Sequence, residues 1–230
     1  MKSLPLYVSI VGLLVASHFT ASAQSVPAES AVTVNALGPV SGANGDKYLN
    51  VEGKSKDKYA CFGVLRFKTT VLKAELDKKF GVGKYKVTGV KLELSQSNAK
   101  FSAAGNVKVY FSADAKTATT GLKYPYNPTG KTLAGSQVGQ VTFTPVPNPA
   151  PATPAGAKTD KPAPRPESHR DVVDISKGAG SGALSTAISS GAVVTLVLAE
   201  GDAAVAATWS GTAPVGKNKP PAIVVTAVKK

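Results

Sequence analysis

Short runs in which apolar and polar residues alternate limit most strongly what this chain can fold into. In residues 89–96, Val90, Leu92 and Leu94 share one side of an extended backbone, and polar side chains take the other side. Such alternation predicts a strand with one buried face. Further runs of strand-forming residues lie at 31–37, 47–53, 106–112, 140–144, 193–199 and 222–228.

Helical periodicity is scarce by comparison. Only residues 70–81 and 182–191 carry a pattern typical of short helices, each ending near a glycine. Residues 193–199 are apolar throughout, which predicts a central strand covered on both faces. Because turn residues separate the predicted strands along the whole chain, we expect an all-β fold, either a sandwich or a barrel.

The first 23 residues have the features of a secretion signal. Lys2 precedes an apolar run at residues 4–16, and small residues follow at Ala21–Ala23. This order predicts a signal peptide, residues 1–23, with cleavage before Gln24. We expect a secreted, extracellular or periplasmic protein. No later apolar run reaches about 18 residues, so we expect no transmembrane segment in the mature chain.

Residues 145–167 differ in composition from the rest of the chain. They hold eight of its sixteen prolines and almost no large apolar side chain. Such a segment cannot bury enough apolar surface to fold, so we expect an exposed, flexible, proline-rich insertion. The part after it is small for an independent sandwich. We therefore predict a single domain over 24–230, whose last strands pair with its first ones.

The chain is strongly basic, with a formal net charge of +13. A basic exported protein is expected to meet acidic partners, such as an anionic polysaccharide or another envelope polymer. The lysines are scattered rather than bunched, which does not favour a specific nucleic-acid partner. A second interpretation stays open, in which the charge only keeps the protein soluble.

Few residues are suited to catalysis. The only cysteine, Cys61, falls on the same side of the run 59–68 as Leu65 and Phe67, which indicates a buried structural side chain. The only histidine after the predicted leader, His169, stands at the edge of the proline-rich segment, where a general base would be poorly held. We therefore expect no enzyme, although carboxylates that meet in space would still allow a polysaccharide lyase.

Carboxylates are also the ligands that a structural calcium ion would need. Asp46 follows a glycine turn, and Asp171 and Asp174 stand close together in the sequence. These three are the candidate calcium ligands, although no spaced calcium-binding motif is present. We expect no other cofactor.

The best candidate for a ligand-binding loop is residues 121–131. Tyr124 and Tyr126 stand there among prolines, with Lys123 and Lys131 beside them. Sugar rings stack on aromatic faces, and lysines bind acidic groups, so this composition favours an acidic carbohydrate. The alternative is that the tyrosines only cover an edge of the fold.

A second candidate surface lies on the predicted strand 106–112. Tyr110 and Lys108 point to its outer side, and Lys91 on a neighbouring strand would extend this basic, aromatic face. Trp209 is the only tryptophan, and it precedes the last strand. A tryptophan in that place is more often part of the core than a stacking platform.

Several segments resemble, in order, the DNRLRE-type domains of secreted bacterial proteins. "LRF" at 65–67 follows "NGDKYLNVEG" at 44–53 and precedes "VTGVKLELSQ" at 87–96, and "DVVDISKG" at 171–178 and "PPAIVVTA" at 220–227 come later. The resemblance implies a jelly-roll-like antiparallel β-sandwich with one or two short helices. It also implies an exported protein with a carbohydrate-binding or cell-surface role and no catalysis.

These observations together predict an exported, non-catalytic module that binds anionic polysaccharide. A structural or adhesive protein of the cell envelope, without a small ligand, is the main alternative.

Overall fold

The computed structural model describes residues 21–40, 43–97, 102–114, 119, 121–146 and 169–230. Two antiparallel sheets pack against each other, so the predicted all-β sandwich is confirmed. The smaller sheet has four strands in the order β1-β12-β6-β9. Their bounds are Ser22–Pro27 (β1), Ala222–Lys229 (β12), Tyr85–Ser95 (β6) and Arg170–Asp174 (β9).

The larger sheet has eight strands. Six follow the order β11-β4-β5-β10-β7-β8, while β2 pairs with β5 and β3 pairs with β2. The bounds are Ala206–Ser210 (β11), Tyr48–Glu52 (β4), Cys61–Lys68 (β5), Val193–Glu200 (β10), Gly105–Ser112 (β7), Ser136–Phe143 (β8), Ser30–Asn35 (β2) and Gly38–Pro39 (β3).

The main core lies between the two sheets. The side chains predicted to share one face of β6, Val90, Leu92 and Leu94, are fully buried there. They belong to the same cluster as Leu196 and Leu198 of β10. Burial of alternate side chains along strands such as β6 therefore supplies apolar contacts to this core.

A second apolar cluster covers the outer face of the larger sheet. Its members from the strands are Val34, Phe62, Val64, Val197 and Ala199, and the segment after β7 adds Leu122 and Leu133. Val197 and Ala199 alternate with Leu196 and Leu198, which face the main core. The prediction that 193–199 is covered on both faces is thus confirmed.

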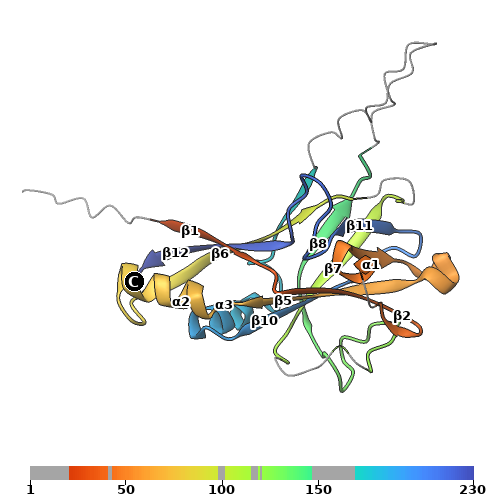
Figure 1. Ribbon diagram of the computed structural model, residues 1–230. Helices are drawn as coiled ribbons and strands as arrows, with labels where there is room; N and C mark the ends of the chain where they lie inside the picture. The colour runs from red at the N-terminus through yellow and green to blue at the C-terminus, as the bar shows by residue number, and fades with distance from the viewer. Residues whose placement is uncertain (1–20, 41–42, 98–101, 115–118, 120, 147–168) are drawn as a thin grey trace, which may run out of the picture.

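Both predicted helices are present. α2 (Thr70–Phe80) buries Leu72, Leu76 and Phe80, and α3 (Ser181–Ser190) buries Leu184 and Ile188. They lie together at one end of the molecule, beside the C-terminus (Figure 1). Two shorter helical segments were not expected, α1 (Ala43–Lys47) and the 3-10 helix η1 (Lys54–Tyr59).

Strands from both sides of the proline-rich segment pair with each other in both sheets. After it, β9 and β12 pair with β6, and β10 pairs with β5 and β7. Most of the segment itself, residues 147–168, lies outside the described residues.

The N-terminal strand crosses the predicted cleavage point. β1 begins at Ser22, which pairs with Ala227 of β12, and the predicted cleavage before Gln24 falls inside this strand. Residues 1–20 of the predicted leader lie outside the described residues. In the described part of the chain, no helix has the length and hydropathy needed to cross a membrane.

Candidate functional site

A loop that folds back over the larger sheet carries the candidate site. Residues 121–135, the second part of the connection from β7 to β8, lie against the outer face of β5, β7 and β10. Leu122 and Leu133 anchor the loop because both side chains are buried against that face. The Tyr124 backbone N–H donates to the carbonyl of Asn35 at 3.1 Å, which ties the loop to β2.

Between the loop and the sheet lies a hollow of about 150 Å³. This is the space of about five water molecules, so the hollow suits a single ring rather than a large ligand. Aromatic and proline side chains make up most of its lining, and one carboxylate is present. The lining residues are Phe62, Tyr110, Tyr124, Pro125, Tyr126, Pro128, Ala199 and Glu200.

Tyr126 is held firmly within this lining. Its ring centroid lies 5.5 Å from that of Phe62 and 5.2 Å from that of Tyr110, both in tilted contacts. Its hydroxyl donates to the carbonyl of Leu133 at 2.9 Å. A side chain at Gly135 would not fit, because a Cβ there would stand 2.7 Å from the Tyr126 hydroxyl oxygen. The ring is therefore fixed before any ligand arrives.

Tyr124 is paired with the single carboxylate of the hollow. Its hydroxyl donates to Glu200 Oε1 at 2.7 Å, and the Lys54 backbone N–H donates to Glu200 Oε2. Burial, together with the bond to Glu200, raises the pKa of the Tyr124 phenol. Burial also raises the pKa of the Tyr126 phenol. Both tyrosines are therefore neutral at physiological pH, and each still has a lone pair to accept a hydrogen bond.

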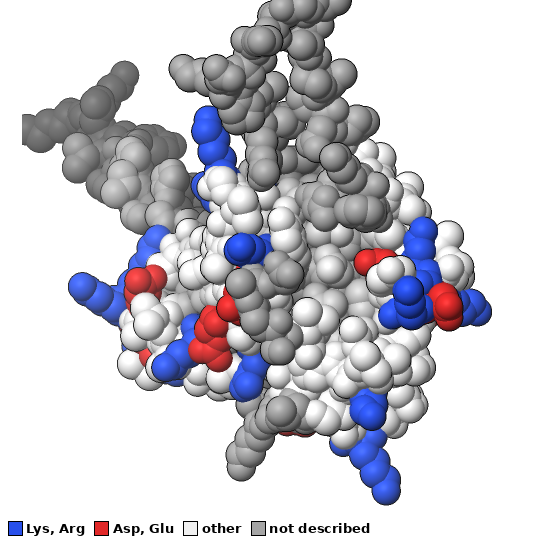
Figure 2. Space-filling view, turned by 45° about the vertical axis from the view of Figure 1, so that its right-hand side comes forward, with Lys and Arg blue, Asp and Glu red and all other residues white. Residues whose placement is uncertain are grey.

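Three of the six predicted ligand residues thus meet in one place, namely Tyr110, Tyr124 and Tyr126. Lys108 stands on β7 opposite Ala199, which is part of the lining. Lys123 and Lys131 are exposed on the loop. In the described part of the chain, none of these lysines forms an ion pair with a carboxylate. Figure 2 shows the basic side chains of one face in separate groups, not as one continuous patch.

The predicted extension of this surface by Lys91 is wrong. β6 and β7 belong to different sheets, and Lys91 pairs with Val224 and Asp174 on its own sheet. Tyr110 is also less exposed than predicted, because Tyr126 packs on it. The alternation placed Tyr110 on the outer face of its strand, but it carried no sign that a loop returns to cover that face.

Two residues of the hollow, Phe62 and Glu200, were not predicted as site residues. Phe62 belongs to the run 59–68, which is apolar on both sides of the strand, so the sequence did carry a sign of cover on the second face. Glu200 is a charged residue directly after seven residues that hold no charge. This place, at the end of an uncharged run, was the signal in the sequence that could have identified Glu200 as a site residue.

Cys61 and Trp209 are core residues, as predicted. Burial raises the pKa of the Cys61 thiol to about 12, so almost no reactive thiolate is present near neutral pH. Trp209 is fully buried, and its ring meets that of Phe143 edge to face.

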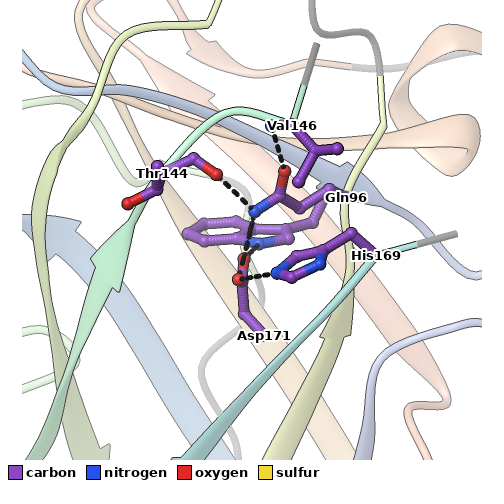
Figure 3. Close-up of polar contacts among 6 residues, drawn as sticks. Gln96, Thr144, Val146, His169 and Asp171 are labelled. Carbon is purple, nitrogen blue, oxygen red and sulfur yellow. Dashed lines mark hydrogen bonds and ion pairs between the residues drawn. The ribbon is translucent and has the colours of Figure 1, made fainter. Parts of the chain in front are cut away.

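Figure 3 shows a polar cluster around Asp171, and the Trp209 indole is one of the hydrogen-bond donors to this carboxylate. Trp209 Nε1 donates to Asp171 Oδ2 at 2.7 Å, and Gln96 Nε2 lies 3.1 Å from both carboxylate oxygens. His169 Nε2 lies 3.5 Å from Asp171 Oδ1. Gln96 Nε2 donates to the Thr144 carbonyl as well. This cluster joins β9 to the residues after β8. The hydrogen bonds of Asp171 therefore have a structural role.

The candidate calcium ligands do not come together. Asp171 is engaged with Trp209 and Gln96, and Asp46 lies on α1. Asp174 accepts bonds from the Ser176 hydroxyl and backbone N–H, which lower the pKa of its carboxyl to about 2. Among the described residues, no group of three or more His, Cys, Asp or Glu side chains is arranged to hold a metal ion.

Two comparisons with known proteins found no match. No protein-family model matches the chain, and no curated protein matches it significantly. The resemblance to DNRLRE-type domains therefore stays a prediction.

Proposed function

We propose that this protein is an exported, non-catalytic binding module that holds a sugar ring of an anionic polysaccharide in the hollow. The observation that carries the proposal is the lining itself, where three tyrosines and Phe62 surround an open space next to one carboxylate. Aromatic faces accept the C–H surface of a sugar ring, and a carboxylate accepts bonds from its hydroxyls.

The rigidity of the hollow favours this function. Tyr126 is fixed by two ring contacts and a hydrogen bond, and Tyr124 is fixed by Glu200. Pro125 and Pro128 stiffen the backbone between and after the tyrosines. A ligand would therefore lose little affinity to the ordering of the loop.

The charges around the hollow favour an acidic polymer. Glu200 can accept hydrogen bonds from the hydroxyl groups of a sugar ring inside the hollow. Lys108, Lys123 and Lys131 are available to bind carboxylate or sulfate groups along the polysaccharide. Because the lysines are partly or fully exposed, salt would weaken their contribution. Retention on an acidic polysaccharide should accordingly fall as the ionic strength rises.

A structural or adhesive envelope protein is the second candidate. This candidate is favoured by two hydrogen bonds, because the hydroxyls of Tyr124 and Tyr126 both donate to groups of the protein itself. On that account, the loop only seals the outer face of the sheet. Binding measurements distinguish the two candidates.

We expect Tyr124→Ala to weaken retention on immobilised alginate or a sulfated glycan at least tenfold, because it removes one stacking face and frees the carboxylate beside it. Tyr124→Phe keeps the ring and should lose only a few-fold. Tyr59→Ala is the matched control, since Tyr59 is 63% exposed and lies on η1, outside the lining of the hollow. Circular dichroism verifies that each variant is folded.

Two results would argue against the proposal. One is the absence of retention of the unchanged protein on every acidic glycan. The other is an equal affinity of Tyr124→Ala and Tyr59→Ala. Release of unsaturated oligosaccharides from the polymer would instead show a lyase.

A further inference from the structure

Lysines gather at the end of the molecule where α2 meets the last strand. They come from three segments: the last turn of α2, the turn before β6 with the start of that strand, and the last residues of the sequence. All are exposed, and we call this group the lysine end. Its members are Lys78, Lys79, Lys84, Lys86, Lys229 and Lys230.

Backbone contacts hold the three segments together. Lys229 pairs with Tyr85, and Val228 pairs with Lys86. The Lys230 backbone N–H donates to the Lys84 carbonyl at 3.0 Å. α2 ends at Phe80, so its last two lysines directly precede this turn. Figure 1 shows the C-terminus beside α2, well away from residues 121–135 (green), which line part of the hollow.

The positive charge of the lysine end is largely uncompensated. Glu75 and Asp77 are the acidic residues of α2, and Asp77 is already engaged by Lys73. Within the described ranges, none of the six lysines of this group forms an ion pair. The group therefore offers its charges to a partner outside the chain.

An apolar side chain projects from the middle of this group. Val82 is 77% exposed and stands between Gly81 and Gly83, whose φ angles of +94° and +67° suit glycine. A Cβ on Gly83 would meet no atom within 4 Å, so the turn extends into open solvent. An exposed valine on a turn between Lys79 and Lys84 is not needed for solubility.

We propose that the lysine end docks on the surface of an anionic phospholipid bilayer. Lysines near such a surface are attracted to acidic headgroups, and an apolar residue at the tip enters the interfacial region. A polysaccharide or nucleic acid would use the same lysines but would gain nothing from Val82. This function goes beyond glycan binding and uses a different part of the protein.

Sedimentation with lipid vesicles tests the proposal. The exported, purified protein is mixed with vesicles of two parts phosphatidylcholine to one part phosphatidylglycerol, and with vesicles of phosphatidylcholine alone. We expect binding only to the acidic vesicles, and we expect salt to release it. Tyr124→Ala should bind the vesicles normally, which separates this proposal from the glycan site.

A charge-matched pair of variants identifies the surface. The test variant carries Lys84→Gln, Lys86→Gln and Lys229→Gln, and the control carries Lys58→Gln, Lys217→Gln and Lys219→Gln. Each lysine lost from the docking surface should weaken partitioning roughly fivefold, so the test variant should bind about 100-fold less and the control nearly normally. Val82→Thr, which keeps the shape but adds a hydroxyl, should bind about threefold less.

The proposal is wrong if the protein does not distinguish acidic from neutral vesicles, or if the two triple variants lose binding equally. It is also wrong if Val82→Thr binds the acidic vesicles as tightly as the unchanged protein. Binding to soluble dextran sulfate without binding to vesicles would assign the lysine end to polyanions in solution.

Discussion

Replacing Trp209 by alanine is expected to lower the free energy of unfolding by about 3–5 kcal/mol. The side chain is fully buried, and its ring centroid lies 5.4 Å from that of Phe143 in an edge-to-face contact. The substitution leaves a cavity in the main core and removes the indole N–H that donates to Asp171 at 2.7 Å. Urea unfolding followed by circular dichroism measures the change, because the variant has no tryptophan left for fluorescence.

Trp209→Phe serves as the control for this prediction. It keeps an aromatic ring in the core and loses the hydrogen bond, so it should cost roughly half as much as the alanine variant. A loss near 1 kcal/mol for Trp209→Ala would contradict the placement of the indole in the core.

The second large effect is expected at Asp171. Asp171→Ala should lower the free energy of unfolding by about 3 kcal/mol, because the Trp209 indole N–H loses its acceptor inside the protein. Gln96 would lose one of its partners and keep the Thr144 carbonyl. Asp171→Asn retains an oxygen for the indole and should cost about 1 kcal/mol. The same urea titrations measure both variants.

Trp209 and Asp171 act through one shared bond, so their effects should not add. The double variant Trp209→Ala, Asp171→Ala is expected to lose at least 1 kcal/mol less than the two single losses combined. Full additivity would contradict the hydrogen bond on which both predictions depend.

The sequence predicted which residues form strands better than it predicted which strands lie side by side. Val90, Leu92 and Leu94 are buried as the alternation indicated, because the period of a strand is a local property. Which strand lies next to which depends on contacts between residues far apart in the chain. The prediction that Lys91 lies beside Tyr110 failed for this reason, since β6 and β7 are in separate sheets.

The candidate site was predicted in part. Tyr124 and Tyr126 were identified because the loop places aromatic side chains among prolines and lysines, a composition that suits an acidic sugar. Glu200 was missed because its partner, Tyr124, is 76 residues away, and nothing local marks the pairing. Phe62 was missed because the run 59–68 indicated cover on its second face but not which segment provides it.

Asp171 illustrates a different limit. From sequence, its carboxylate was a candidate calcium ligand beside Asp174. In the structure, Asp171 accepts bonds from Trp209 and Gln96, which come from distant segments, while Asp174 is engaged by Ser176 next to it. The identity of a side chain limits its chemistry, but the neighbours brought by the fold determine which part of that chemistry is used.

A crystal structure of the protein with an acidic oligosaccharide tests the central claim most directly. The glycan-binding account predicts one sugar ring in the hollow, with a face against Tyr124 and a hydroxyl donating to Glu200. Acidic groups of the neighbouring sugars should point toward Lys108 or Lys123. A bound oligosaccharide on another surface, with the hollow filled only by water, would contradict the account.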